Sequence, residues 1–224
     1  MSETVLIADD HPLFRQALSL AVQRVLPDAR IAEAGTLAAA ARVATETGDL
    51  CLILLDLKMP GAVGYSGIAL LHAERPTVPI LVVSSAEGAS AAQEAHAFGA
   101  VGFLPKDSDL AVIERAIGDA LNGAALNRDG GRGGRTAAAV PADDTHHGEP
   151  LAAIRRDVAG LTPTQLKVLL AVLDGQLNKQ IAHSLSMSEA TVKAHMTAIM
   201  RKLDVSNRTQ AALVARSLGL DLRH

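Results

Sequence analysis

The first 122 residues alternate short apolar runs with longer segments of helical spacing. Most runs are continuously apolar, which is typical of strands buried on both faces of a parallel sheet, and the segments between them are long enough for right-handed helical crossovers. The predicted strands are Val5–Ala8, a weaker Arg30–Ala32, Leu52–Leu55, Ile80–Val83 and Val101–Leu104. The predicted helices are Pro12–Leu26, Thr36–Thr47, Gly67–Glu74, Ala89–Phe98 and Asp109–Leu121. Five βα units predict a doubly wound α/β domain over residues 1–122.

The pattern changes at Gly123. From there to Pro150 the chain is rich in Gly, Ala and Arg and offers little that could form a core. This composition predicts a flexible linker over residues 123–150.

Residues 151–224 are predicted to form a small all-α domain. Thr162-Pro163-Thr164-Gln165 has a Thr N-cap, a Pro at the first helical position and a Gln at the third, which is the pattern of a capping box. Three short helices are predicted to follow, and the tight turns between them favour a helix-turn-helix unit. These helices are Lys179–Leu185, Glu189–Leu203 and Arg208–Leu218, with Asn178, Ser188 and Asn207 as N-caps.

Composition and charge indicate that the two parts of the chain have different partners. Hydrophobic residues make up 49% of the chain but aromatic residues only 2%, so aliphatic side chains must form the cores, and the single cysteine, Cys51, excludes an intrachain disulfide. Residues 1–122 carry 8 Lys and Arg against 15 Asp and Glu, whereas residues 151–224 carry 10 against 5. The basic C-terminal part favours a polyanionic partner. With no long apolar run, we expect a soluble, cytoplasmic protein.

Polar residues follow four of the predicted strands. Asp9 and Asp10 follow the first, Asp56 the third, Ser84 the fourth and, after one proline, Lys106 the fifth. Because ligands of open α/β sheets bind beyond the carboxyl ends of the strands, these side chains are expected to converge on one crevice. Singly, each has a simpler interpretation as a helix cap, turn residue or surface charge. Together they predict a site where crowded carboxylates bind Mg²⁺, leaving one of them free to attack phosphorus.

These motifs resemble the receiver domain of NarL/FixJ response regulators over residues 4 to about 121. The resemblance rests on Ile7–Pro12, Leu54–Gly61, Val83–Ser85 and Gly102–Asp107. It implies a flavodoxin-like sheet of order 2-1-3-4-5, with Asp56 as phosphoacceptor for a histidine kinase. It also implies that Mg²⁺ is held by Asp9, Asp10, Asp56 and the main-chain carbonyl of Lys58, that Lys106 contacts the phosphoryl group, and that Ser84 and Phe103 form the switch pair.

One enzyme class uses similar chemistry. Haloacid-dehalogenase-like phosphohydrolases also carry an Asp nucleophile after a strand and bind Mg²⁺, but they need a second carboxylate two residues further on. That position holds Lys58. The sequence therefore favours a protein that is not an enzyme, with the phosphohydrolase as a remote alternative.

The predicted helix Glu189–Leu203 has two faces. Val192, Met196, Ile199 and Leu203 recur at helical spacing as an apolar stripe, and Lys193, Thr197 and Arg201 form a polar stripe. An apolar inner face and a basic outer face fit the recognition helix of a helix-turn-helix, although a solvated amphipathic helix shows the same pattern.

The region 161–218 resembles a LuxR-type helix-turn-helix. The matching motifs are Leu161-Thr162, Asn178–Ala182, Thr191–Lys193 and Asn207–Ala211. The resemblance implies that Lys193, with Ala194 and Thr197, enters the major groove, while Lys179, Thr191 and Arg201 face phosphates. It makes the last helix, with Ala211, Ala212 and Ala215, the dimer contact.

The chain is thus predicted to be a DNA-binding transcription regulator controlled by phosphorylation. Its expected partners are a cognate histidine kinase, double-stranded DNA, a second copy of the chain and RNA polymerase. An orphan regulator that keeps the pocket but works without phosphorylation is the main alternative.

Overall fold

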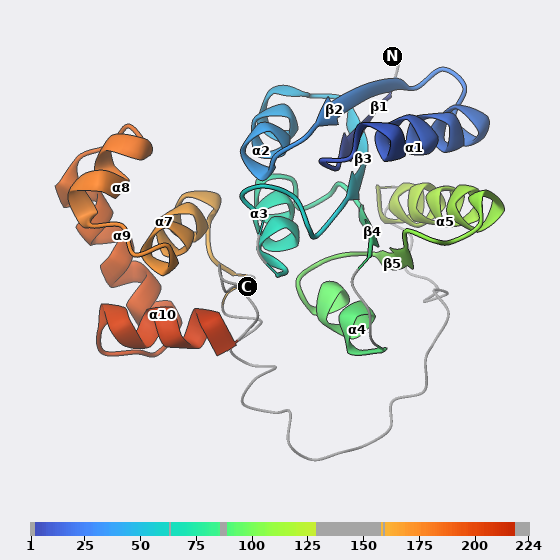
Figure 1. The fold of residues 1–224 in the computed structure, drawn as a ribbon. Helices are drawn as coiled ribbons and strands as arrows, with labels where there is room; N and C mark the ends of the chain where they lie inside the picture. The colour runs from blue at the N-terminus through green and yellow to red at the C-terminus, as the bar shows by residue number, and fades with distance from the viewer. Residues whose placement is uncertain (1–2, 63, 86–88, 129–157, 159, 218–224) are drawn as a thin grey trace.

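The computed structural model describes residues 3–62, 64–85, 89–128, 158 and 160–217. Its N-terminal part is a five-stranded parallel sheet of order β2-β1-β3-β4-β5, as predicted (Figure 1). The strands are β1 (Thr4–Ala8), β2 (Arg30–Ala34), β3 (Leu50–Leu55), β4 (Ile80–Ser84) and β5 (Gly102–Pro105). The helices between them are α1 (Pro12–Val25), α2 (Leu37–Glu46), α3 (Ser66–Glu74), α4 (Ala89–Ala97) and α5 (Leu110–Arg128).

The sheet separates two apolar layers, because successive residues of a strand point to opposite faces. Val5 and Ile7 of β1 belong to the layer that α1 and α5 cover. Leu6 and Ala8 belong to the layer beneath α2, α3 and α4. Both layers consist mainly of Ala, Leu, Ile and Val, as the low aromatic content requires. Cys51 lies buried in β3 within the first layer, as expected.

Helix α5 differs from its predicted end. It continues to Arg128 and so includes the first six residues of the predicted linker. Ala124, Ala125 and Leu126 have high helix propensity, which favours continuation of the helix beyond Gly123. The rest of the predicted linker, residues 129–150, lies outside the described residues.

The C-terminal part is helical. Its helices are α7 (Pro163–Leu173), α8 (Asn178–Ser184), α9 (Glu189–Lys202) and α10 (Arg208–Ser217). The capping box at α7 is confirmed, since Thr162 Oγ1 accepts from the Gln165 amide at 3.3 Å and Gln165 Oε1 accepts from the Thr162 amide at 3.1 Å. Ser188 and Asn207 also cap their helices as predicted, each accepting from the amide three residues on.

The predicted cap of α8 was wrong. Asn178 is the first residue of the helix, and Leu177 is the N-cap. Leu177 has no side-chain acceptor, but its amide donates to Gln180 Oε1 at 2.7 Å, so the helix start is stabilised from the third position alone. Asn178 Oδ1 instead accepts from Arg208 Nη1 at 2.8 Å, which ties α8 to α10.

Candidate functional site

The carboxyl ends of β1, β3, β4 and β5 bring Asp9, Asp56, Ser84 and Lys106 together. Main-chain hydrogen bonds continue the strand pairing into this edge: the Asp56 amide donates to the Ala8 carbonyl at 2.8 Å, and the Lys106 amide donates to the Ser84 carbonyl at 3.1 Å. Asp9, Asp56 and Ser84 are buried, with 1%, 2% and 0% of their surfaces exposed. Buried polar groups need partners, and here they supply them to one another.

Asp56 is at the centre of this pocket. Its Oδ1 accepts hydrogen bonds from Ser84 Oγ at 2.7 Å and from the Lys58 amide at 3.1 Å. Its Oδ2 accepts from Lys106 Nζ at 2.9 Å. Lys106 Nζ also lies 2.6 Å from Asp9 Oδ2, so one ammonium bridges two carboxylates. The hydroxyl and the ammonium are thus already placed around the carboxylate that the sequence singled out.

The electrostatics keep Lys106 charged. Burial is the largest single influence on its pKa and lowers it, but the hydrogen bonds to Asp9 and Asp56 together outweigh burial and raise the pKa above the ordinary value. The Phe14 ring, whose centroid is 4.8 Å from Nζ, adds a cation–π contact. Lys106 therefore provides a positive charge beside Asp9 and Asp56 throughout the neutral pH range.

The oxygen atoms of the pocket fit a hard divalent cation. One ligand atom from each of Asp9, Asp10, His11 and Asp56 lies within 4.8 Å of the others. Asp9 Oδ2 and Asp10 Oδ1 are buried, and each lies 2.6 Å from one nitrogen, Lys106 Nζ and His11 Nδ1 respectively. Crowded carboxylate oxygens of this kind suit Mg²⁺. The acidic cluster of Asp9, Asp10 and Asp56 is therefore compatible with the predicted Mg²⁺ site.

Three residues of the α1 start belong to the site but were not predicted. His11 Nδ1 lies 2.6 Å from Asp10 Oδ1, Phe14 lies beneath Lys106, and Arg15 Nη1 donates to the Asp9 carbonyl at 2.8 Å. The only sequence signal for them is their position directly after Asp10. They fall within the first helical turns directly after Asp10, so α1 returns them to the strand end from which it starts.

Phe103, the predicted partner of Ser84 in the switch, lies on the neighbouring strand. It is half-buried and opposite Val82, two residues before Ser84. Its ring packs against the layer formed by α2, α3 and α4. The structure thus shows one arrangement of this pair, in which Ser84 Oγ is bonded to Asp56.

The second candidate site is the outer face of α9. Val192, Met196 and Ile199 are buried, which confirms the predicted inner stripe. The residues of the predicted DNA face are all exposed: Lys179, Thr191, Lys193, Ala194, Thr197 and Arg201. The Thr197 hydroxyl donates to the Lys193 carbonyl at 3.0 Å, so its remaining capacity is that of an acceptor and a methyl group.

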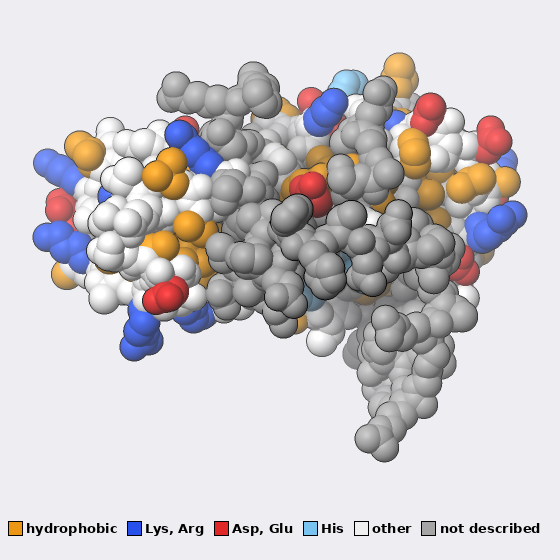
Figure 2. All heavy atoms as spheres, turned by 90° about the horizontal axis from the view of Figure 1, so that it is seen from below, with side chains coloured by type: hydrophobic (Ala, Val, Ile, Leu, Met, Phe, Trp, Pro, Cys, Tyr) orange, Lys and Arg blue, Asp and Glu red, His pale blue; other side chains and the backbone are white. Residues whose placement is uncertain are grey.

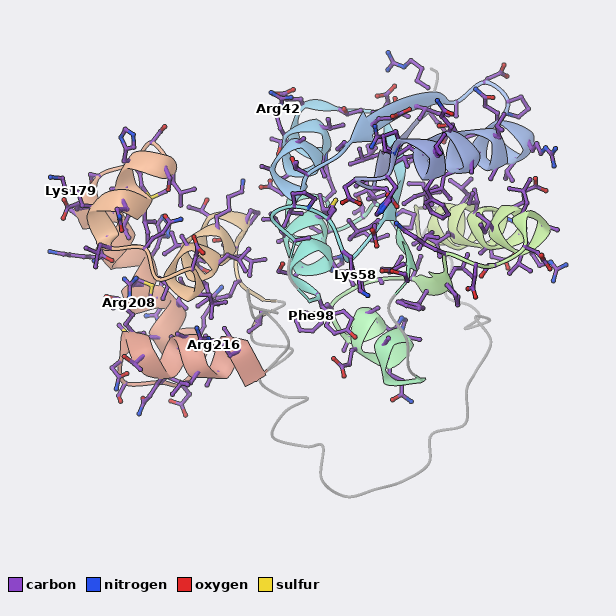
Figure 3. All side chains as sticks on the ribbon, in the orientation of Figure 1. Arg42, Lys58, Phe98, Lys179, Arg208 and Arg216 are labelled. Atoms are coloured by element: carbon purple, nitrogen blue, oxygen red, sulfur yellow. The ribbon has the colours of Figure 1, made fainter. Side chains whose placement is uncertain are left out.

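A hollow of about 420 Å³ adjoins this face. Lys193 and Thr197 of α9 line it together with Asn178 and Arg208, which the sequence analysis did not assign to the site. Figure 3 shows Lys179 and Arg208 on the side of the helical domain that faces away from the sheet. Figure 2 shows Lys and Arg side chains along the outer rim of this domain. Lys179, Lys193 and Arg201, which the sequence predicts to contact DNA, are thus exposed on this domain.

Of the three alanines in the predicted dimer contact on α10, Ala212 is partly exposed, but the other two need correction. Ala211 and Ala215 are 0% exposed and pack inside the helical domain itself, so they are not available to a second chain. Between them Leu213 is exposed over 57% of its surface. The two alanines are four residues apart, so both lie on the inner face of α10. Alanine is common on exposed and buried helix faces alike, so the sequence did not reveal this.

Comparison with known proteins settles the family. Residues 5–118 match the model of the response regulator receiver domain, and residues 159–215 match that of the bacterial regulatory proteins of the luxR family. The chain belongs to the NarL/FixJ-type response regulators. As a member of this family it is a transcription regulator that combines a receiver with a LuxR-type DNA-binding domain.

Relatives of this response regulator match it over nearly its whole length. The glycerol metabolism activator of Pseudomonas putida is 38% identical over 219 residues, which cover 94% of both chains. The nitrate/nitrite response regulator NarP of Escherichia coli is 32% identical over 210 residues, covering 94% of this chain and 93% of NarP.

Solved structures agree on the fold. Full-length FixJ from B. japonicum covers 100% of both chains at 20% identity with a TM-score of 0.50. A LuxR-family response regulator from Aurantimonas sp. is 27% identical with a TM-score of 0.50, over 55% of this chain and 87% of that one. Among the described residues of the receiver and of the DNA-binding domain, no helix is long and apolar enough to cross a membrane.

Proposed function

We propose that Asp56 accepts a phosphoryl group from the phosphohistidine of a cognate histidine kinase, and that this step controls sequence-specific binding of double-stranded DNA. The observation that carries the proposal is the set of contacts to Asp56. The buried Asp56 carboxylate has a hydroxyl donor at one oxygen and an ammonium at the other. The same two donors could bind the oxygens of a phosphoryl group after Asp56 has attacked phosphorus.

In the proposed transfer, an Asp56 carboxylate oxygen attacks phosphorus and the bond between phosphorus and the imidazole nitrogen breaks, with its electron pair leaving on the imidazole. Lys106 and Ser84 turn their donors from the carboxylate to two phosphoryl oxygens. Asp9, Asp10, Asp56 and the Lys58 carbonyl would hold Mg²⁺, which supplies charge neutralisation to the transferred group. Asp9 also holds Lys106 in place, since the two are 2.6 Å apart.

At the other end of the chain, we propose that α9 enters the major groove. Lys193, Ala194 and Thr197 project from its outer face and would contact base edges. Lys179, Thr191 and Arg201 would contact phosphates. The predicted cytoplasmic location and contact with RNA polymerase belong to this same proposal.

Control by phosphorylation is proposed to act through dimerisation of receivers. Pairing two receivers raises the effective concentration of the second DNA-binding domain at a two-half-site operator. On α10, the exposed Leu213 and the partly exposed Ala212 are then available to a second DNA-binding domain, whereas Ala211 and Ala215 are buried.

The test is phosphorylation of the full-length protein by acetyl phosphate and by kinase. We expect labelling that requires Mg²⁺, is absent in Asp56→Asn and falls sharply in Asp10→Ala. Metal-independent labelling of Asp56→Asn at the wild-type level would contradict the pocket assignment. Normal labelling of Asp56 with no change in DNA binding would instead identify an orphan regulator.

A further inference from the structure

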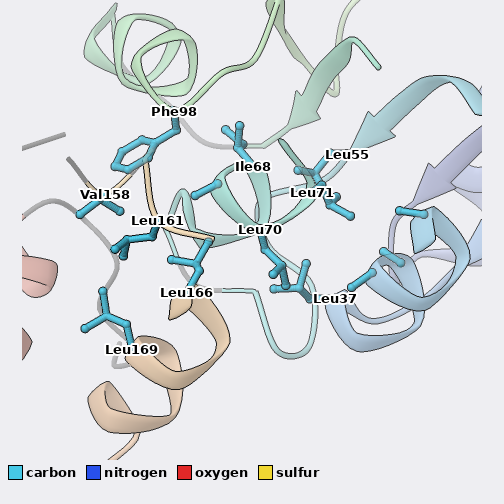
Figure 4. Packing of buried hydrophobic residues seen from close by; sticks show 14 of the residues in the cluster. Leu37, Leu55, Ile68, Leu70, Leu71, Phe98, Val158, Leu161, Leu166 and Leu169 are labelled. Atoms are coloured by element: carbon cyan, nitrogen blue, oxygen red, sulfur yellow. The ribbon is translucent and has the colours of Figure 1, made fainter. Parts of the chain in front are cut away.

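The receiver and the DNA-binding domain share an apolar contact. Helix α3 of the receiver lies against α7, and the residues just before α7 reach the end of α4 (Figure 4). Val158, Leu161 and Leu166 are exposed over 1%, 3% and 1% of their surfaces and belong to the same core cluster as Leu70 and Phe98. Figure 4 shows Val158 facing Phe98 and Leu166 facing Leu70. These five side chains, which we call the interdomain contact, exclude water from both domains at once.

An ion pair orients this contact. Lys167 Nζ of α7 lies 2.6 Å from Glu74 Oε1 at the end of α3. Only 12% of the Glu74 side chain is exposed, and its other oxygen accepts from Thr45 Oγ1 of α2 at 3.4 Å. The Glu74 carboxylate thus lies between Thr45 of the receiver and Lys167 of α7. The apolar residues supply the burial, and the ion pair fixes where α7 lies along α3.

The same segment is tied to the recognition helix. Lys202, the last residue of α9, donates to the Gly160 carbonyl at 2.7 Å and to Gln165 Oε1 at 3.1 Å. Gly160 and Gln165 flank Leu161, which is buried in the interdomain contact. The two hydrogen bonds of Lys202 thus connect the end of α9 to the residues around Leu161, which pack against the receiver.

The docked arrangement leaves the DNA face open. Lys193 and Thr197 at the centre of the predicted face are exposed while α7 is packed on the receiver. Lys179 lies on the side of the domain opposite to the receiver (Figure 3). Helix α7 packs on α3, and α9 lies on the far side of α7 from the receiver (Figure 1).

From these observations we propose that the α3 face of the receiver, with Phe98, is the docking surface for Val158, Leu161 and α7 of the same chain. This dock orients the recognition helix without covering it. The proposal does not depend on the phosphoryl chemistry of Asp56, because every residue that carries it lies outside the phosphoacceptor pocket.

The first test asks whether the dock forms within one chain. The unphosphorylated full-length protein, mixed from unlabelled and ¹⁵N-labelled stocks, is treated with a zero-length carbodiimide and analysed by mass spectrometry. We expect an amide bond between Glu74 and Lys167 within single chains. Lys167→Arg is the control, since it keeps the charge but has no amine to couple. A link found only between light and heavy chains, or no link, would overturn the proposal.

The second test asks whether the Glu74–Lys167 ion pair holds the two domains together. Glu74→Lys places two ammonium groups together and should loosen the dock, whereas Glu114→Lys makes the same charge change at the distant Arg24 pair. By small-angle scattering we expect expansion in Glu74→Lys only, reversed by adding Lys167→Glu. An unexpanded Glu74→Lys would overturn the proposal.

DNA binding is measured on a half-site duplex recovered by in vitro selection with this protein. Because the DNA face is already open, Glu74→Lys and Glu114→Lys should bind within about twofold of each other at equal salt. If Glu74→Lys binds the duplex about tenfold or more tightly than Glu114→Lys, the dock covers the DNA face. That result would overturn the proposal.

Discussion

The phosphoacceptor pocket and the DNA face are built in opposite ways. The pocket joins residues from four strand ends, between Asp9 and Lys106, and its central side chains are buried and bonded to one another. The DNA face takes most of its residues from α9 alone, and these side chains are exposed. One site is assembled by the tertiary fold and the other by helical periodicity.

This difference decides what each site can do without a partner. In the pocket, the Asp56 carboxylate already has its donors, Ser84 Oγ and Lys106 Nζ, within the chain. On the DNA face, the hydroxyls of Thr191 and Thr197 bond within their own helix region, to Ser188 Oγ and to the Lys193 carbonyl. Its cationic side chains gain a defined geometry only against phosphates or bases, so its specificity depends on the DNA as much as on the protein.

The largest expected effect joins the two regions. If phosphorylation pairs receivers, phosphorylated full-length protein should bind a two-half-site operator about 10²–10⁴ times more tightly than the unphosphorylated protein, because the second DNA-binding domain binds at high effective concentration. Fluorescence anisotropy measures the affinity, and light scattering the mass. A single half-site is the control and should show little gain. An equal gain on the single half-site would mean that phosphorylation changes the DNA face itself.

Lys106→Met should break the pocket without unfolding it. The substitution removes the cation that bridges Asp9 and Asp56, so we expect the rate of labelling by acetyl phosphate to fall by about 10²–10³-fold. The affinity for Mg²⁺, measured by titration calorimetry, should rise, because the metal then becomes the main source of positive charge between these carboxylates. Lys106→Arg keeps a positive charge, so its labelling rate should fall less than that of Lys106→Met. Wild-type labelling in Lys106→Met would limit Lys106 to a structural role.

The sequence predicted the sheet and the central residues of the pocket because continuous apolar runs and the polar residues after them are local signals. Asp56, Ser84 and Lys106 meet as expected once the strands are parallel. The roles of Phe14 and Arg15 were missed because they depend on how α1 folds back over the strand end.

Packing between distant elements was the least predictable property. Nothing local marks Leu161 and Leu166 as partners of Leu70, since an apolar residue in a small helical domain serves its own core equally well. Likewise Tyr65, the residue before α3, stacks on Phe98 with ring centroids 5.6 Å apart, and this contact depends on a residue more than thirty positions later.

On the DNA face, two lysines should behave differently. Lys193→Ala should cost about 1–3 kcal/mol in binding and relax the preference at one position of each half-site, because a base contact is lost. Lys179→Ala should weaken binding to all sequences alike, because one phosphate contact is lost. The slope of log K against log salt concentration should become shallower by about one unit. Binding to a panel of single-base operator variants at several salt concentrations distinguishes the two. Equal, sequence-independent losses would assign both lysines to phosphates.

The smallest expected effect concerns the start of the recognition helix. Ser188 Oγ accepts from the Thr191 amide at 3.1 Å, so Ser188→Ala leaves a helix-terminal amide without its cap and should lower the free energy of unfolding by about 1 kcal/mol. Ser188→Asp keeps the acceptor and adds a charge that favours the helix N-terminus, so its loss should be smaller. Urea unfolding followed by circular dichroism measures both. Because the cap is local to α9, labelling of Asp56 should stay at the wild-type rate in both variants. A slower rate would show that the pocket and the DNA face are coupled more tightly than their separate construction implies.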